Sequence, residues 1–201
     1  MENIKIKTSY LILIVAAAII ALLVYVITRP SPPPVVVSAG NSPFIGPANA
    51  SITVIEFFDF QCPACRDVEP TYNQIRETYK DRVKFVERNF PLSQHEFAEN
   101  AAEASLCAYE QNRYWEYHDS LIAGNLDIDS LKQYAKDLGL NTTQFNECLD
   151  SGKYFSEVQK DYQDGISYGV DATPTFFLNG KKMTIASYAD FQRAIESALS
   201  A

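Results

Sequence analysis

The sequence predicts an α/β fold: a mixed central sheet flanked by helices, with an inserted helical domain and one transmembrane helix in front of it. Three observations support this class. Strand-like, helix-like and strand-like segments follow one another from residue 51. A long helix-rich stretch comes next, and a hairpin with a last helix ends the chain. A parallel strand–helix–strand unit extended by an antiparallel hairpin makes a mixed sheet. We expect helices to cover both faces of this sheet.

The composition limits the possible classes of protein. The chain has 201 residues, of which 47% are hydrophobic and 21% charged. This balance fits one globular domain with a sizeable core and excludes a mostly disordered chain, a collagen and a multi-pass transporter. The formal net charge of −8 leaves no basic surplus to neutralise phosphates, so we expect no nucleic-acid partner.

An apolar segment near the N-terminus favours a membrane anchor. Residues 10–27 carry no charge and would span about 27 Å as a helix, close to the hydrocarbon thickness of a bilayer. Two lysines precede the run and one arginine follows it, a weak bias toward a cytoplasmic N-terminus. We interpret residues 1–9 as a cytoplasmic tail and 10–28 as a single-pass signal anchor of the cell membrane, with the remaining chain extracytoplasmic. A cleaved signal peptide and a buried core helix are the alternatives.

A proline-rich segment follows the anchor. Residues 29–45 contain runs of proline, which favour an extended, semi-rigid spacer. We interpret this segment as a stalk and residues 46–201 as the folded domain. That domain is strongly acidic, which keeps it soluble and repels it from anionic lipid head groups.

The first half of the domain has clear strand and helix signals. Residues 51–59 are β-branched and aromatic and predict a buried strand. Pro63 occupies the position that proline prefers in the first turn of a helix, which we expect to run to about residue 80. Apolar side chains recur on that helix at helical spacing: Val68, Tyr72, Ile75 and Tyr79. A second strand is expected at 83–90.

The second half is mostly helical. Residues from about 93 to 168 form the insertion, with four or five helices separated near Gly124, Gly139 and Gly152. Residues 175–178 and 182–185 then predict a hairpin around the Asn179-Gly180 turn. Ser187 can cap the last helix.

Two cysteines of the run Cys62-Pro63-Ala64-Cys65 carry the chemistry. Free backbone N–H groups and the helix dipole would stabilise an anion at Cys62, lower its pKa and make it the nucleophile. Cys65 would be shielded one turn inside the helix and act as the resolving thiol. Half of a zinc site is the alternative, but zinc needs four ligands and the sequence offers no second pair. A strand that leads directly into such a motif is typical of a thioredoxin-like redox site, with no metal and no organic cofactor.

Three segments resemble the DsbA-like thiol:disulfide oxidoreductases. The run from Glu56 to Cys65 is similar to their active-site strand and helix, and residues 171–177 to their cis-proline loop. Residues 101–119 are similar to their inserted helical domain. The resemblance extends in order over about residues 46–200. It implies a thioredoxin fold with a helical insertion.

The resemblance also implies roles for particular residues. Pro174 would be cis and face the redox disulfide of Cys62 and Cys65, and the backbone of Thr173 would pair with substrate. Glu56 matches a buried carboxylate that relays a proton to the resolving thiol; its alternative is a solvated glutamate or one paired with a lysine.

Family members with cysteines at the positions of Cys107 and Cys148 use them to staple the insertion. Two buried free thiols, or a second redox pair, are the alternatives. A disulfide here would presuppose an oxidising compartment.

Two departures from the family pattern bear on redox direction. Related oxidases often have valine where this chain has Thr173, whereas some isomerases have threonine. The best-known oxidase has Pro-His between its cysteines, and Ala64 offers no comparable help to a thiolate. We therefore expect a less extreme pKa at Cys62 and a less oxidising couple.

The resemblance favours oxidation of paired cysteines in newly exported or unfolded proteins by a monomer, with a quinone-linked membrane reoxidase as partner. A reductase or isomerase kept reduced by a membrane electron donor is the enzymatic alternative. A non-redox holdase or adaptor for exported chains is the alternative from another class.

Overall fold

The computed structural model describes residues 2–28, 37–185 and 187–200. The chain divides into two units, Met1–Pro34 and Val35–Ala201. The first contains helix α1 (Glu2–Thr28), whose side chains are described from residue 10 to residue 25. Over the described residues, none of the helices combines the length and the apolar character that crossing a membrane requires. Residues 29–36 of the expected stalk lie outside the described part of the chain.

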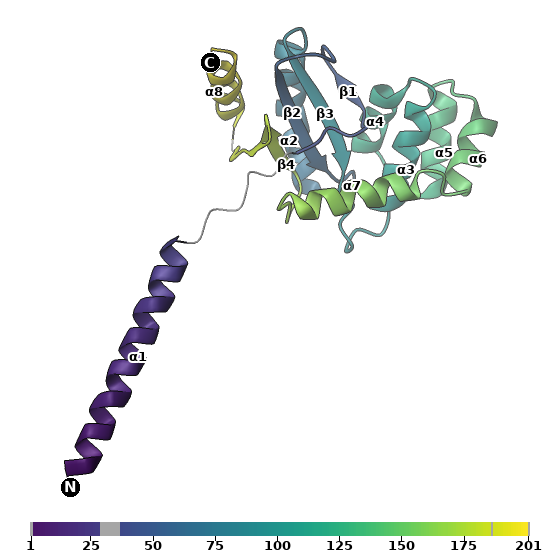
Figure 1. Ribbon diagram of the computed structural model, residues 1–201. Coiled ribbons are helices and arrows are strands. Elements are labelled where there is room, and N and C mark those ends of the chain that lie inside the picture. Colours follow the sequence, from purple (N-terminus) through teal and green to yellow (C-terminus); the bar gives the residue numbers. More distant parts are fainter. Residues whose placement is uncertain (1, 29–36, 186, 201) are drawn as a thin grey trace. The chain divides into compact units, whose positions relative to one another are not determined.

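The second unit is built on a five-stranded sheet in the order β1-β3-β2-β4-β5 (Figure 1). Strands β2 and β3 are parallel, and the other neighbouring pairs are antiparallel, as expected for a mixed sheet. The strands are β1 (Phe44–Ile45), β2 (Ile52–Phe58), β3 (Val83–Asn89), β4 (Thr175–Leu178) and β5 (Lys181–Lys182). The helices are α2 (Pro63–Tyr79), α3 (Ala98–Tyr109), α4 (Tyr114–Ala123), α5 (Ile128–Asp137), α6 (Thr142–Asp150), α7 (Phe155–Ser167) and α8 (Tyr188–Leu199).

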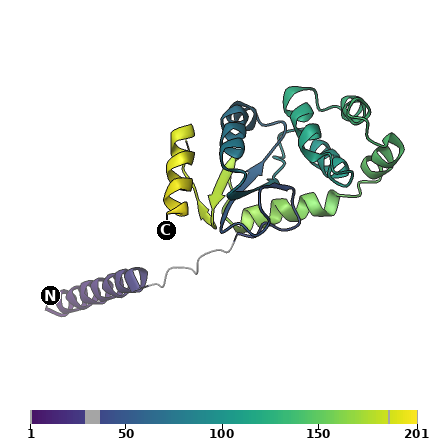
Figure 2. The same cartoon turned by 90° about the horizontal axis from the view of Figure 1, so that it is seen from above.

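Helices cover both faces of the sheet. On one face α2 and α8 pack through aromatic side chains, with Tyr72 against Phe176 and Phe191. On the other face lies α7, which approaches the sheet closely because Gly165 has no side chain: a Cβ there would come within 2.7 Å of the Phe90 ring. Figure 2 shows this layering from above, with α7 on the side of the sheet opposite α8.

The insertion between β3 and β4 consists of α3 to α7. Its core is continuous with the end of the sheet, because side chains from the β2–α2 connection join those of the inserted helices in one buried cluster. That cluster contains Phe58, Phe60, Cys62 and Cys65. The cysteine motif therefore lies at the junction between the sheet and the inserted helices.

The sheet begins before residue 46, where the sequence placed the start of the domain. Phe44 and Ile45 form β1 and pair antiparallel with Val86 and Phe85 of β3. The backbone oxygen of Ser38 accepts a hydrogen bond from the buried Arg88. The proline-rich composition therefore continues into the first residues of the folded unit, and the stalk boundary at residue 45 is too far along the chain.

The C-terminal hairpin has the expected turn and a shorter second strand. Asn179 and Gly180 have φ values of 47° and 80°, the left-handed conformations that an Asn-Gly hairpin turn needs. Strand β5 ends at Lys182: one further backbone hydrogen bond runs from Met183 N–H to Phe176 O, but residues 183–185 do not extend the strand. Ser187 stands at the N-cap of α8, but its hydroxyl donates to the Asp190 carboxylate instead of accepting from the helix backbone.

Candidate active site

The two cysteines of the motif occupy the first turn of α2, directly after β2. Cys62 is the N-cap residue and Pro63 the first helical residue, as the spacing predicts. Both cysteines are free thiols, so the structure describes the reduced dithiol. Cys62 is 6% exposed and Cys65 is fully buried. Only Cys62 is therefore accessible to an incoming sulfur.

The surroundings of the two thiols shift their pKa values in opposite directions. A hydrogen bond from Cys65, with help from the Thr173 hydroxyl and the N–H groups of Ala64 and Cys65, lowers the pKa of Cys62 to about 5, although burial opposes this. Burial raises the pKa of Cys65 far above its ordinary value, and its hydrogen bond to Cys62 and the Glu56 carboxylate add to this. At neutral pH Cys62 is a thiolate and Cys65 a thiol, the roles that the sequence predicts for them.

The loop before β4 brings Thr173 and Pro174 to Cys62. The Thr173–Pro174 peptide bond is cis. The backbone oxygen of Thr173 lies 3.4 Å from Cys62 Sγ. The Thr173 hydroxyl is buried and has no hydrogen-bond partner among the described residues, so it is available to the thiolate. Sequence alone did not indicate this contribution of the side chain.

Replacing Thr173 by valine should raise the pKa of Cys62, because the variant keeps the shape of the side chain but loses the hydroxyl that stabilises the thiolate. The pKa is read from the ultraviolet absorbance of the thiolate as a function of pH. Thr175→Val is the matched control, because the Thr175 hydroxyl donates to Ala172 O at 2.7 Å. If Thr173→Val titrates like the wild type, the hydroxyl does not support the thiolate.

Glu56 is fully buried on β2, and neither of its carboxylate oxygens has a hydrogen-bond partner among the described residues. The alternatives of a solvated glutamate and of one paired with a lysine do not fit this environment. Burial raises its pKa well above the ordinary value, and the carboxylates of Glu87 and Glu69 raise it further, against the opposing effect of Arg76. A carboxyl group with a raised pKa near Cys65 is suited to exchange a proton with it.

Behind Cys65 lies a group of ionisable side chains, which we call the buried charge cluster; of its members only Glu56 was expected from the sequence. Its members come from four elements and none is more than 3% exposed: Glu56, Glu69, Arg76, Glu87 and His118. Arg76 donates to the carboxylates of both Glu69 and Glu87. One signal was present in the sequence, because Glu69 and Arg76 stand four and eleven residues after Cys65, on the same side of a helix.

Asp59 organises the loops beside the motif. Its carboxylate accepts from the backbone N–H groups of Gln61 and Leu92 and lies 2.7 Å from His95 Nδ1. These contacts give Asp59 a structural role at the end of the strand.

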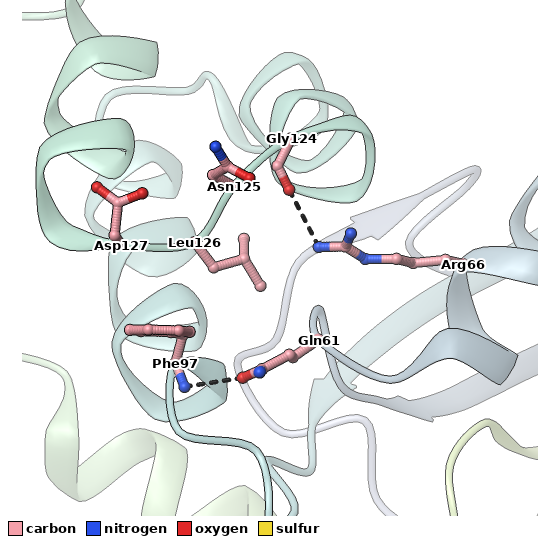
Figure 3. A pocket seen from close by; sticks show the side chains of 7 residues that line it. All are labelled: Gln61, Arg66, Phe97, Gly124, Asn125, Leu126 and Asp127. Atoms are coloured by element: carbon pink, nitrogen blue, oxygen red, sulfur yellow. Dashed lines mark hydrogen bonds between the residues drawn. The ribbon is translucent and has the colours of Figure 1, made fainter.

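A pocket of about 280 Å³ lies between the motif and the insertion (Figure 3). Arg66 crosses its wall and donates to the backbone oxygens of Gly124 and Leu121. Gln61 accepts from the backbone N–H of Phe97. These contacts attach the start of α2 to the inserted helices.

A second hollow, of about 440 Å³, lies on the cis-proline side of the motif. Its lining combines apolar side chains with the oppositely charged Asp171 and Lys182. The apolar members are Ala64, Val68, Pro174, Phe176, Met183 and Ile185. An adjoining hollow of about 310 Å³ shares Ala64, Val68 and Ile185. Together they form a groove that includes Ala64 of the cysteine motif.

Cys107 of α3 and Cys148 of α6 form a disulfide within the insertion. This is the pairing that the resemblance implied, and it excludes two free thiols at these positions. Both residues are buried in the core that also contains the motif. The disulfide thus links two helices of the insertion, and the redox motif packs against this insertion.

The comparisons agree with this fold. The family described as Thioredoxin matches residues 38–197, so the chain belongs to this thioredoxin family. BdbD from Bacillus subtilis, solved in its oxidised form, is 26% identical with a TM-score of 0.74, over 82% of this chain and 96% of that one. A thioredoxin-like oxidoreductase from Silicibacter pomeroyi is 25% identical with a TM-score of 0.72, over 81% and 94%. DsbA of Chlamydia trachomatis shares the fold at 19% identity, with a TM-score of 0.71 over 85% and 98%.

Curated relatives are much longer than this chain. A Na⁺/H⁺ antiporter NhaA 3 from Salinispora tropica is 36% identical over 140 residues, which make up 68% of this chain and 21% of the antiporter. The chain thus spans about a fifth of the length of the curated relatives that it matches. Together the fold, the dithiol and the cis-proline loop define a DsbA-like thiol:disulfide oxidoreductase domain.

Proposed function

We propose that the protein oxidises pairs of cysteines in exported, unfolded proteins. The observation that carries this proposal is the asymmetry of the dithiol: an accessible Cys62 with a pKa of about 5 beside a buried Cys65 whose pKa is raised. A thiol of low pKa is a good leaving group in disulfide exchange. The low pKa also means that the Cys62 thiolate, and with it the reduced enzyme, is stabilised. This favours transfer of the enzyme's disulfide to a substrate.

The reaction follows from these roles. A substrate thiolate attacks the sulfur of Cys62 in the oxidised enzyme, and the Cys62–Cys65 bond breaks. Cys65 leaves with the electron pair and takes up a proton. A second substrate thiolate then attacks the substrate sulfur of the mixed disulfide and displaces the Cys62 thiolate. The substrate has lost two electrons, which the enzyme dithiol now carries.

The pKa of Cys62 bears on the direction of the reaction. A value of about 5 lies between the thiols of DsbA, about 3.5, and thioredoxin, about 7. This agrees with the expectation that Ala64 gives a less extreme site than Pro-His. Because some isomerases have threonine at the position of Thr173, an isomerase or reductase kept reduced by a membrane electron donor stays the alternative. We propose a moderately oxidising couple.

The groove beside Ala64 and Pro174 supports a peptide as substrate. It is partly apolar, lies along the cis-proline loop and is also lined by Asp171 and Lys182. An unfolded chain could lie there while its cysteine reaches Cys62. This geometry suits extended segments with apolar side chains.

The location of the protein and its reoxidising partner belong to the same proposal. The uncharged run at residues 10–27 and the Cys107–Cys148 disulfide both favour a domain held on the extracytoplasmic side of the cell membrane. A quinone-linked membrane protein would then restore the Cys62–Cys65 disulfide. No organic cofactor is needed in this chain.

The oxidised full-length protein should transfer one disulfide per molecule to a reduced, unfolded substrate that has two cysteines. Transfer is followed by alkylating the remaining thiols and weighing both proteins by mass spectrometry. We expect stoichiometric oxidation of the substrate and reduction of Cys62 and Cys65. If the substrate stays reduced while the enzyme keeps its disulfide, the proposed oxidase function is wrong.

A further inference from the structure

The buried charge cluster occupies the space between Cys65 and the inserted helix α4. Cys65, Glu69 and Arg76 lie on the buried side of α2. Opposite them, Glu56 of β2 is the parallel-strand partner of Glu87 on β3, so the two carboxylates point to the same face of the sheet. The cluster thus extends from the resolving thiol to α4.

His118 closes the cluster on the side of α4. Its imidazole is fully buried, stacks on the Phe58 ring and contacts the Phe60 ring. Nε2 lies 3.4 Å from Glu87 Oε2 and 4.0 Å from Glu69 Oε1, and it has no hydrogen-bond partner among the described residues.

The other nitrogen of the imidazole faces the surface. Nδ1 lies 3.3 Å from Asp119 Oδ1, and the side chain of Asp119 is 72% exposed. His118 therefore stands between a carboxylate in solvent and two carboxylates in the core.

The other charged and titratable groups around His118 also favour proton exchange at its imidazole. From α2, Arg76 pairs with Glu69 and Glu87, and from α4 the Tyr114 hydroxyl donates to Glu87 at 3.0 Å. Burial lowers the pKa of His118, but Glu87, Asp119 and Glu69 together outweigh it and raise that pKa. An imidazole can both accept and donate a proton, one at each ring nitrogen.

Glu56 needs a route by which protons reach water, because its side chain has no contact with solvent. When Cys65 gains or loses its proton, Glu56 is suited to supply or accept it, and must then exchange that proton with water. Several polar atoms of this region lack hydrogen-bond partners among the described residues and can take part in the exchange: both oxygens of Glu56, Glu69 Oε2, His118 Nε2 and the Tyr72 hydroxyl.

We propose that His118 and Asp119 form the route by which the proton of Cys65 passes between the buried charge cluster and solvent. His118 is a positioning and proton-carrying residue that acts through the carboxylates and does not touch the reacting sulfurs. The inference rests on the dithiol exchange proposed above but applies to either redox direction. Cys65 loses a proton when its sulfur attacks Cys62 to form the disulfide. It takes up a proton again when that disulfide is broken and its thiol is released.

The test isolates the step in which Cys65 must lose its proton. The reduced full-length protein is mixed with oxidised glutathione: the Cys62 thiolate forms a mixed disulfide and releases one glutathione thiolate. Cys65 then gives up its proton, attacks Cys62 and expels the second glutathione. Acid quenching, alkylation and mass spectrometry follow the two steps separately.

Asp119→Asn is the main variant, because an exposed change leaves the core intact, and Asp129→Asn is its control on another exposed helix position. The first step should be unchanged. The second should slow by roughly tenfold, less than the roughly hundredfold expected for losing a direct general base. Imidazole added to the buffer should restore the rate, while the equilibrium constant with glutathione stays within about twofold.

His118→Gln, with Tyr117→Phe as the control for a buried change in the same helix, tests the inner end of the route. It should show the same slow, buffer-sensitive second step. Unchanged second steps in both variants, or slowing that imidazole does not relieve, would overturn the proposal. Failure of the wild type to form the mixed disulfide would instead reject the proposed dithiol exchange, so the two failures are distinguishable.

Discussion

Cys62→Ser should reduce disulfide exchange to the uncatalysed rate, because a serine hydroxyl is not ionised at neutral pH and forms no disulfide. Cys65→Ser should behave differently. It keeps the thiolate of Cys62 but lacks the resolving thiol, so mixed disulfides with glutathione or substrate should accumulate. Both results can be read from non-reducing gels and mass spectra after alkylation.

Thr78→Ser, a conservative change on the exposed side of the same helix, serves as the control for both cysteine variants. The pair of variants also separates an enzyme from a holdase. A protein that only binds exported chains would protect a reduced substrate equally well whether residue 62 is cysteine or serine. Full activity of Cys62→Ser in a folding assay would therefore reject the redox mechanism.

The second large effect concerns the staple of the insertion. Replacing Cys107 and Cys148 by alanine should lower the free energy of unfolding by about 4 kcal/mol, the value expected for a closed loop with a sequence separation of 41 residues. For a domain of this size the melting temperature should fall by roughly 8–16 °C. Circular dichroism on heating measures the change.

Reductant supplies the control for this comparison. With excess dithiothreitol the wild type should lose the same stability, and the double variant should change little. The loss should also affect redox activity near the melting temperature, because the motif packs in the same cluster as the staple. Equal melting temperatures of the wild type and variant without reductant would show that the disulfide does not stabilise the domain.

Local signals in the sequence predicted the helix that carries the motif and the hairpin turn. Pro63 sets the start of α2, and Asn179-Gly180 can reverse the chain, because both effects depend on the conformations of neighbouring residues. The two-residue strand β1 was missed. It lies next to a proline-rich stretch and is too short for any periodicity, and its pairing with β3 depends on residues some forty positions away.

The candidate site was predicted only in part. Cys62 and Cys65 follow from one motif, whereas Thr173 and Glu56 required the resemblance to a family. The rest of the buried charge cluster was missed: the helical spacing of Glu69 and Arg76 from Cys65 was one signal, but charged residues on β3 and α4 look like ordinary surface residues. Burial and proximity exist only after the insertion has packed on the sheet.

The reduction potential of the Cys62–Cys65 couple tests the proposed oxidase most directly. The full-length protein is equilibrated with defined mixtures of reduced and oxidised glutathione, and alkylation with mass spectrometry gives the redox state of these two cysteines. With the pKa of Cys62 at about 5, we expect a potential between about −120 and −180 mV, the range of DsbA and protein disulfide isomerase. A potential near −270 mV, as in thioredoxin, would contradict the oxidase function and identify a reductant.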